Sequence, residues 1–553
     1  MSAARADVIV IGGGHNGLVA AGLLAKRGLA VTVLERRDRV GGAAITEQPW
    51  GPDFKMTALS YVVSLLPPAV VEELELARFG YKVYPQHPYF VPHADGRYLM
   101  LCEDPARRRA QIAKFSERDA AEMEAWDAWL GRLASVLGPL LMQVPPRLGS
   151  KRPRDLLAAL RLAWRLRKLD ERGVADVTRL MTMSEADLLE ERFESDAVRG
   201  ALSVSGVIGA WAGPRSPGTA YVMLHHKLGD AGSPAPGPAP GPAGDGGGFG
   251  GSGGDGGPPR GTWGFPEGGM GGVTAAMRAA AERFGAKIRT GAEVGQIMVR
   301  DGRVTGVALV SGEELDADVV IATTHPKITF LRHLDRADLP EDFVTAIERW
   351  RSRSGTVKVN LALDRLPEFA CKPGFDPEVH GGTIVLAQSI NELEGAFQDA
   401  VAGTPARVPF ADICIPSVFD PTLAPPGKHV MSMFTQWVPH GYAAAPHAAE
   451  LDAYADRVIA RMEELAPGFT SSILHRQVIG PHEMETKYSL LGGNIFHGEL
   501  SADQLFHMRP APGYADFTTP IRGLYQASSA THGGGGVTGI PALQVVRRLG
   551  KLR

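Results

Sequence analysis

The sequence predicts an α/β fold in which a Rossmann-type nucleotide-binding domain is interleaved with a second, mixed α+β domain. Residues 7–44 combine an apolar strand, a glycine loop, a helix and a second strand that ends in an acid. Residues 262–322 contain a glycine turn, a helix and several strands, and residues 520–549 repeat the order of strand, glycine turn and apolar segment. With 553 residues the chain is longer than one typical core, so two or more domains are expected.

The N-terminal stretch "DVIVIGGGHNGLVAAGLLAKRGLAVTVLERRDRVGGAA" has the order that a dinucleotide-binding fingerprint requires. Its first five residues, DVIVI, are apolar and β-branched after the initial aspartate and predict a buried parallel strand. Helix-forming residues follow the glycine loop. Gly12 permits a tight turn, Gly14 lets the backbone approach a pyrophosphate, and Gly17 lets the helix pack close to the strand. Glu35 ends the second strand where a carboxylate can accept hydrogen bonds from a ribose and would repel the 2′-phosphate of NADP. The alternative is a chance glycine loop in an ordinary strand–helix turn.

The segment "ERRDRVGGAAIT" resembles the flavoprotein superfamily that includes monoamine oxidases and phytoene desaturases. The resemblance implies FAD as the cofactor, with a second close backbone approach at Gly41 and Gly42. Many members have an arginine after this glycine pair, whereas Ala43 stands here, which favours the phytoene-desaturase branch. The alternative for Arg36 and Arg37 is that they lie in a solvated loop and bind no cofactor. Further cofactor contacts are expected from His15, Asn16 and Arg36.

The region after these motifs predicts mostly helices. Residues 105–200 are rich in Leu, Ala, Arg and Glu. Within them, "SKRPRDLLAALRLAWRLRKLDERG" is basic and amphipathic, and residues 147–172 hold nine Lys/Arg against three Asp/Glu. Such a helix could lie on an anionic membrane surface, but we favour a helix whose apolar stripe faces the core. Residues 57–66, "TALSYVVSLL", also predict a packed helix, with an approach of Ser60 and Tyr61 to the flavin as the alternative.

Residues 229–261 are so rich in Gly and Pro that they predict a mobile loop. After the loop we expect a helix, a strand near 286–290, a hairpin with its turn at Asp301–Gly302, and a strand at 318–322. In the resembled family the backbone of a strand meets the adenine at the position of Val294. On physical grounds alone, Val294 is a buried β-branched residue.

Residues 354–364, "SGTVKVNLALD", alternate as a strand does and place Lys358 and Asn360 on one face. A lysine near flavin N5 assists some members of the resembled superfamily, which makes Lys358 a candidate catalytic residue. The alternative that we favour is a lysine on an exposed strand face.

The stretch "PIRGLYQASSATHGGGGVTGIPALQVVRRL" predicts a short strand, a glycine turn and a helix. Backbone N–H groups there can face an electron-rich ring edge, and a helix N-terminus stabilises the negative charge of a reduced flavin. The stretch resembles a glycine-rich segment of phytoene-desaturase-like proteins, which assigns flavin contacts to Ser529, Gly535, Gly536 and Val537. His532 is a candidate catalytic donor to flavin or substrate, and the alternative is a histidine that only holds the loop.

Composition excludes several other classes of protein. The formal net charge of −3 argues against a nucleic-acid binder. Cys102, Cys371 and Cys414 are far apart, which argues against a disulfide scaffold, a redox cysteine pair and a structural metal site. A cytoplasmic location is therefore expected, or a mitochondrial one in a eukaryote, with peripheral membrane contact left open. No run of 18 or more residues is apolar throughout, and a first strand near Asp7 leaves little room for a targeting peptide.

We expect residues 1–80, 262–330 and 500–553 to form the FAD-binding domain and residues 81–228 and 331–499 to form the substrate domain. The predicted function is an FAD-dependent oxidoreductase of the phytoene-dehydrogenase type, in which a hydrophobic small molecule delivers a hydride equivalent to flavin N5. The sequence specifies neither the electron acceptor nor the oligomeric state. The alternatives are a flavin-dependent amine oxidase, a carotenoid-type isomerase, and a flavin-bound interaction protein with little turnover.

Overall fold

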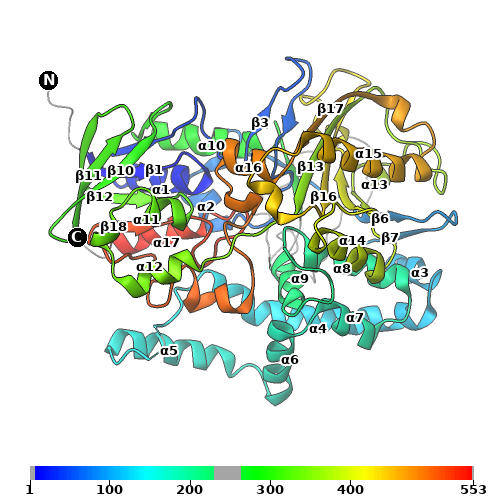
Figure 1. The fold of residues 1–553 in the computed structure, drawn as a ribbon. Helices are drawn as coiled ribbons and strands as arrows, with labels where there is room; N and C mark the ends of the chain where they lie inside the picture. Colours follow the sequence, from blue (N-terminus) through cyan, green and yellow to red (C-terminus); the bar gives the residue numbers. More distant parts are fainter. Residues whose placement is uncertain (1–5, 148, 229–262, 551–553) are drawn as a thin grey trace.

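The computed structural model describes residues 6–147, 149–228 and 263–550, so the predicted mobile loop at 229–261 lies outside the described residues. Within this part of the chain, two seven-stranded sheets stand side by side, each covered by helices (Figure 1). Two-stranded pieces pair β3 (Thr46–Glu47) with β4 (Met56–Thr57) and β5 (Val83–Pro85) with β8 (Gly264–Pro266).

The first sheet contains the N-terminal βαβ unit. Its parallel strands lie in the order β18–β12–β1–β2–β9, and β10 and β11 extend β12 as an antiparallel hairpin. The hairpin turns at Asp301 and Gly302, both at positive φ, as predicted. The strands of this sheet are β1 (Ala6–Ile11), β2 (Val31–Leu34), β9 (Lys287–Arg289), β10 (Val294–Arg300), β11 (Arg303–Leu309), β12 (Glu314–Ala322) and β18 (Leu524–Gln526).

Helices cover both faces of the first sheet, because successive side chains of a strand point to opposite sides. Val8 and Val10 share an apolar cluster with α1 (His15–Lys26), α10 (Met270–Arg283) and α17 (Ile540–Leu549). The intervening residues of β1 share another cluster with α11 (Pro326–Leu331) and α12 (Glu341–Glu348). Helix α12 therefore packs on the first sheet, although its residues fall in the range that we assigned to the second domain.

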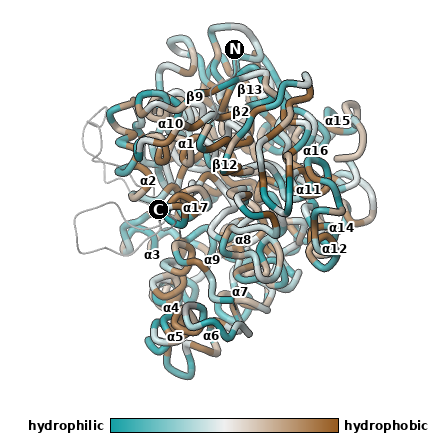
Figure 2. Tube along the Cα trace, turned by 90° about the vertical axis from the view of Figure 1, so that its left-hand side faces the viewer, coloured by the Kyte–Doolittle hydropathy of each residue, from teal (hydrophilic) through white to brown (hydrophobic). Residues whose placement is uncertain are grey.

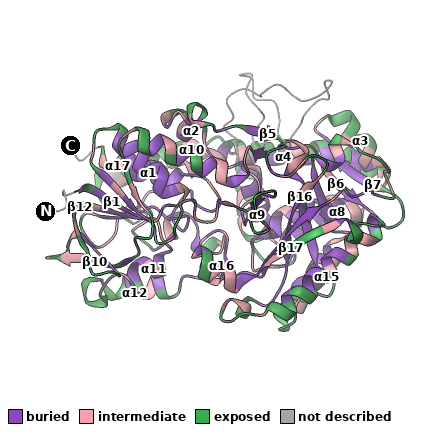
Figure 3. Cartoon of the chain, turned by 90° about the horizontal axis from the view of Figure 1, so that it is seen from above, coloured by how far each residue is buried: buried purple, intermediate pink, exposed green. Residues whose placement is uncertain are grey.

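The second sheet is mostly antiparallel, in the order β17–β13–β16–β15–β14–β6–β7, and only β14 and β6 pair in parallel. Its central strands are buried along almost their whole length, as the purple strands of Figure 3 show. The strands are β6 (Tyr89–Pro92), β7 (Tyr98–Leu101), β13 (Thr356–Leu363), β14 (Thr383–Leu386), β15 (Phe410–Cys414), β16 (His429–Gln436) and β17 (Ile473–Ile479).

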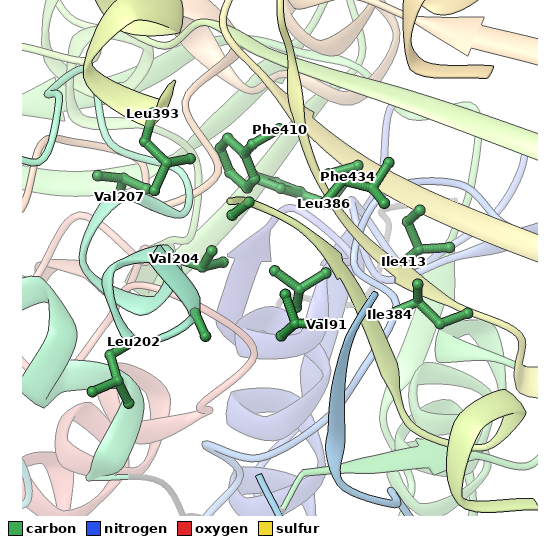
Figure 4. Packing of buried hydrophobic residues seen from close by; sticks show 14 of the residues in the cluster. Val91, Leu202, Val204, Val207, Ile384, Leu386, Leu393, Phe410, Ile413 and Phe434 are labelled. Atoms are coloured by element: carbon green, nitrogen blue, oxygen red, sulfur yellow. The ribbon is translucent and has the colours of Figure 1, made fainter. Parts of the chain in front are cut away.

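A helical layer lies against the second sheet, and residues 105–200 within it are mostly helical, as their composition predicts. Figure 4 shows side chains of α8, such as Val204 and Val207, beside Leu393 of α14 and Phe410 of β15. The helices of this half are α3 (Pro105–Ala113), α4 (Glu117–Leu141), α5 (Pro153–Leu166), α6 (Glu171–Thr182), α7 (Glu185–Arg192), α8 (Asp196–Val207), α9 (Thr219–Lys227), α13 (Pro377–His380), α14 (Ile390–Val401) and α15 (Ala448–Leu465). Helix α2 (Pro68–Glu73) lies beside the first sheet, and α16 (Pro481–Tyr488) follows β17 directly and lies between the two sheets (Figure 1).

Three expectations are wrong. Residues 58–66 form no helix, because Pro67 and Pro68 follow and disfavour helical backbone before them. Lys358 is only 1% exposed, because β13 lies between β16 and β17 rather than at a solvated face. The apolar stripe of α5 faces outward, since the helix uses another face to contact the body of the protein.

Candidate functional site

A cavity of about 540 Å³ lies between the two sheets. It begins at the carboxyl ends of β1 and β2 and continues beneath the second sheet to α4, α8 and α9. Ligands bind at the carboxyl ends of strands in open α/β sheets, and cavities of this volume are typical of small-molecule sites. The cavity therefore joins the predicted nucleotide site to the helical layer.

The N-terminal glycine loop lines the first part of the cavity through close backbone contacts. Gly12 has φ +99°, and a Cβ on Gly17 would lie 1.9 Å from the Gly12 carbonyl oxygen. The Gly41 N–H donates to the Gly13 carbonyl at 2.9 Å, which brings the second glycine pair against the loop. Helix α1 begins at His15 without a side-chain cap, so its first N–H groups remain available to an anion.

Glu35 is buried at the end of β2 and lines the same part of the cavity. Its Oε2 accepts the Gly13 N–H at 2.8 Å, and its Oε1 accepts the Arg37 N–H at 2.9 Å. These two bonds fix the carboxylate, and each oxygen keeps a lone pair for a hydroxyl. Glu35 is thus pre-oriented for the ribose contact that its position predicts.

Two buried polar atoms at the start of α1 lack a partner among the described residues. They are Nε2 of His15 and Oδ1 of Asn16, and both residues line the cavity. Burial lowers the pKa of His15 to about 3, so its ring is neutral at physiological pH. Nδ2 of Asn16 lies 3.4 Å from Oγ of Ser529, which links the N-terminal loop to the C-terminal glycine segment. Unpartnered buried polar atoms are costly, so their position in a cavity indicates a ligand.

The C-terminal segment supplies Ser529, Gly536 and Val537 to the cavity wall. Gly535 is not in the wall, and its carbonyl lies 3.4 Å from Nε2 of His225. Helix α17 begins only at Ile540, so its N-terminus starts later than the glycine pattern suggests.

His532 lies on the far side of this segment. Its Nε2 is 2.9 Å from the Leu140 carbonyl at the end of α4, and the residue is outside the cavity wall. Burial lowers the pKa of His532 to about 4, so the ring is neutral and Nε2 donates to the carbonyl. This geometry matches a histidine that holds the loop.

Some of the other predicted cofactor residues line the cavity, and the rest only support its loops. Val294, Arg36, Ala43 and Gly42 line the cavity, whereas Gly41 and Gly17 support the loops from behind. The Arg36 side chain also donates to the Thr486 and Lys487 carbonyls at 2.9 and 3.2 Å, which ties this loop to α16. Arg36 is exposed, as the solvated-loop alternative expects, but these two hydrogen bonds hold its side chain against α16.

A buried polar network lies at the other end of the cavity, on the second sheet. The Tyr61 hydroxyl donates to Oδ1 of Asp412 at 2.8 Å. Nζ of Lys358 lies 4.0 Å from the centre of the Tyr61 ring and donates to Oγ of Ser432. Tyr61 and Asp412 line the cavity, but Lys358 lies behind them.

Burial perturbs both charged members of this network. The pKa of Asp412 rises to about 6, because desolvation outweighs the Tyr61 hydrogen bond and the nearby lysine. The pKa of Lys358 falls to about 7, because desolvation outweighs the nearby Cys414 and Asp412. Both groups therefore exchange protons near neutral pH, which is the range that acid–base chemistry requires.

Two further residues of the cavity wall, Asp412 and Thr323, carry no motif in the sequence that singles them out. Asp412 is a carboxylate within the apolar strand "FADIC", and an ionisable residue in a buried strand is itself a signal of function. Thr323 follows β12 at the carboxyl edge of the first sheet, where its hydroxyl donates to the Ile11 carbonyl at 2.8 Å. The signal in the sequence was its place directly after a predicted strand, because ligands bind at the carboxyl ends of such strands.

A family model described as "Flavin containing amine oxidoreductase" matches residues 17–540. The chain belongs to this family. FAD is therefore its cofactor, and the residues present fit that group: the uncapped start of α1, the fixed carboxylate of Glu35 and the unpartnered atoms of His15 and Asn16 all face one cavity.

The chain is similar to several curated proteins and to several solved structures. Pyridine nucleotide-disulfide oxidoreductase domain-containing protein 2 of Rattus norvegicus is 36% identical, covering 96% of this chain and 91% of the relative. A lycopene-forming phytoene desaturase of Pseudescherichia vulneris is 24% identical, covering 97% and 96%. A solved structure of putrescine oxidase bound to putrescine has 17% identity and a TM-score of 0.57, covering 99% and 98%, and shows the same fold.

The described residues contain no metal-site cluster, no disulfide and no membrane-spanning helix. No three His, Cys, Asp or Glu side chains in the described ranges gather as a metal site would need. Cys102, Cys371 and Cys414 are all free thiols, so the disulfide in the name of the rat relative has no counterpart among them. No described helix combines the length and hydropathy that crossing a bilayer would need.

Proposed function

We propose that this FAD-dependent oxidoreductase dehydrogenates a largely apolar small molecule, which lies in the second part of the cavity with its reacting carbon near Asp412. The observation that carries the proposal is one continuous cavity with two chemically different ends. Glycine backbone and Glu35 line one end, and mostly apolar side chains line the other, together with the carboxylate of Asp412 and the polar side chains of Gln86, His226, Lys227 and Thr383.

The apolar end has the composition of a site for a hydrophobic ligand. Its apolar wall consists of Trp126 and Leu130 of α4, Leu202 of α8, Ile208 just after α8, and Met223 of α9. Burial of apolar surface is worth roughly 25 cal/mol per Å², so such a wall favours a hydrocarbon over a polar metabolite. Relatives named phytoene desaturase support the same substrate class by analogy.

Asp412 supplies the acid–base chemistry. FAD, when bound, accepts the hydride equivalent that leaves the substrate. Loss of a hydride from one carbon is balanced by loss of a proton from the neighbouring atom, whose bonding electron pair forms the new double bond. Oδ2 of Asp412, the oxygen that the Tyr61 hydrogen bond leaves free, takes up that proton. With its pKa near 6, Asp412 is mostly ionised at pH 7 and is a competent acceptor. Lys358 orients Tyr61 from behind and makes no direct contact with the cavity.

Anaerobic reduction of the purified yellow protein tests this proposal. Apolar alkenes and terpenoid alcohols should bleach the flavin absorbance, and the Asp412→Asn variant should bind the same FAD but bleach much more slowly. Bleaching by none of these compounds, with bleaching by amines instead, would reject the apolar substrate.

Amine oxidation is the second candidate, and Asp412 favours it as well. An ionised carboxylate beside the Tyr61 and Phe434 rings, whose centroids are 6.1 Å apart, can hold an alkylammonium group. Peroxide release with amines under air would identify this activity. Turnover only by prereduced protein, without net loss of electrons from the flavin, would identify an isomerase. A reduced flavin that no acceptor reoxidises would identify an interaction protein with little turnover.

A further inference from the structure

Helix α5 exposes an unusual amount of apolar surface. Leu156 and Leu157 are 51% and 48% exposed, and Leu160 and Trp164 are 66% and 64% exposed. Positions three and four apart lie on one side of a helix, so these four side chains form one continuous outer stripe. Trp164 is the exposed member of the eight tryptophans, all of which lie in the described residues.

The same helix contacts the rest of the protein through a different face. Leu162 and Leu166 are half-buried and pack against the large apolar cluster of the second sheet and helical layer. In Figures 1 and 2, α5 runs along the lower edge of the molecule, next to α4 and α6. The outer stripe is therefore held in place by an inner contact, with nothing described covering it.

Basic residues surround the stripe. Residues 147–172 carry a net charge of +6 within a chain of net charge −3, so the remainder of the chain carries −9. Arg161, Arg167 and Lys168 are exposed, and no ion pair with a described residue neutralises them. Arg167 also lies 4.4 Å from the centre of the Trp164 ring. A leucine and tryptophan stripe flanked by cations is the pattern of a helix that lies in the surface of an anionic bilayer.

We propose that α5 is a monotopic membrane-surface helix that docks the enzyme on an anionic lipid bilayer, with Leu156, Leu160 and Trp164 at the acyl boundary. At 1.5 Å per residue, its 14 residues extend about 21 Å, so the helix lies in the plane of the surface rather than crossing it. A second copy of the chain is a poorer occupant, because a two-fold interface on this face would bring two segments of charge +6 together. The proposal does not depend on the catalytic role assigned to the cavity.

Co-sedimentation of the full-length holoprotein with vesicles tests the proposal. Binding is expected to vesicles of phosphatidylcholine with phosphatidylserine and to weaken at high salt and on phosphatidylcholine alone. Leu160→Ser with Trp164→Ser, and separately Arg161→Glu with Lys168→Glu, should each weaken binding by at least about tenfold. Val310→Ser with Phe375→Ser removes two side chains that are 67% exposed elsewhere, and this control should bind as the unmodified protein does.

A second readout locates the contact. Lipids brominated on the acyl chain should quench the fluorescence of the unmodified protein, and Trp164→Phe should lose this quenching while it still sediments. FAD content checks that each variant is folded. No sedimentation with phosphatidylserine vesicles, or full sedimentation of the Leu160→Ser, Trp164→Ser variant, would overturn the proposal. A dimer that this variant dissociates, without lipid binding by either protein, would assign the face to a second copy and overturn it equally.

Discussion

Replacement of Asp412 by Asn removes the proposed proton acceptor with little change in shape. The Tyr61 hydroxyl, 2.8 Å from Oδ1, can still donate to an amide oxygen, so the fold and FAD content should persist. The rise of the Asp412 pKa from 3.8 to about 6 corresponds to ~3 kcal/mol in favour of the neutral acid. Flavin reduction in the unmodified protein should therefore fall roughly tenfold per unit as the pH drops below about 6, because the acid form cannot accept a proton.

Loss of a positioned acid–base group lowers rates by roughly 10²–10⁴-fold, or ~3–5 kcal/mol of activation free energy. Asp412→Asn should show this loss at pH 7 and a flat profile below pH 6. Anaerobic stopped-flow measurement of flavin bleaching, with a substrate that reduces the unmodified protein, gives both quantities. Asp338→Asn, the same change at an exposed site, should leave the rate unchanged. An Asp412→Asn rate within threefold of the unmodified one, with the slope below pH 6 retained, would refute the reasoning.

The remaining predictions concern the cofactor, a structural histidine and a buried acid. Gly14 has φ −73°, and a Cβ added there would lie 3.9 Å from the nearest protein atom, so the Gly14→Ala variant should fold. Its methyl group would occupy the space of the cofactor, and the variant should purify with about a tenth of the FAD or less. The control variant Gly131→Ala, in α4, should stay yellow. His532→Gln should lower the melting temperature, because loss of the buried hydrogen bond to the Leu140 carbonyl costs ~1–3 kcal/mol of stability. The pH profile of flavin reduction should not change. A shifted profile at an unchanged melting temperature would contradict the structural role of His532. Glu185 is fully buried, and desolvation raises its pKa well above the usual value, so the native state holds a proton that the unfolded state releases. Stability from this group is lost as pH rises above ~4.3, so Glu185→Gln should melt higher than the unmodified protein at pH 8 and at about the same temperature near pH 4.

The glycine motifs could be predicted from sequence because their geometry is local. A strand, a loop of glycines and a helix determine one another over about thirty residues, and Gly12, Gly14 and Glu35 take the positions that this order implies. The fold class follows from the same pattern repeated in three parts of the chain.

Properties that depend on distant neighbours could not be predicted in this way. Alternation shows that Lys358 and Asn360 share a face, but not that β13 has a strand on each side and a covered face. Helical periodicity reveals the stripe of α5 but not which stripe faces the core, because Leu162 and Leu166 offer a second one. Asp412 accepts a hydrogen bond from Tyr61, which lies 351 residues away in sequence, and no local pattern predicts that contact.

The interleaving of the two ends of the chain affects the order of events during synthesis. Asn16 and its neighbour in the cofactor site, Ser529, are 513 residues apart, and β18 joins the first sheet beside β12. At 5–20 residues per second, a ribosome needs roughly 25–100 s to make the intervening chain. The nascent βαβ unit must wait that long for Ser529 and β18, so the cofactor site is complete only when the last part of the chain has been made.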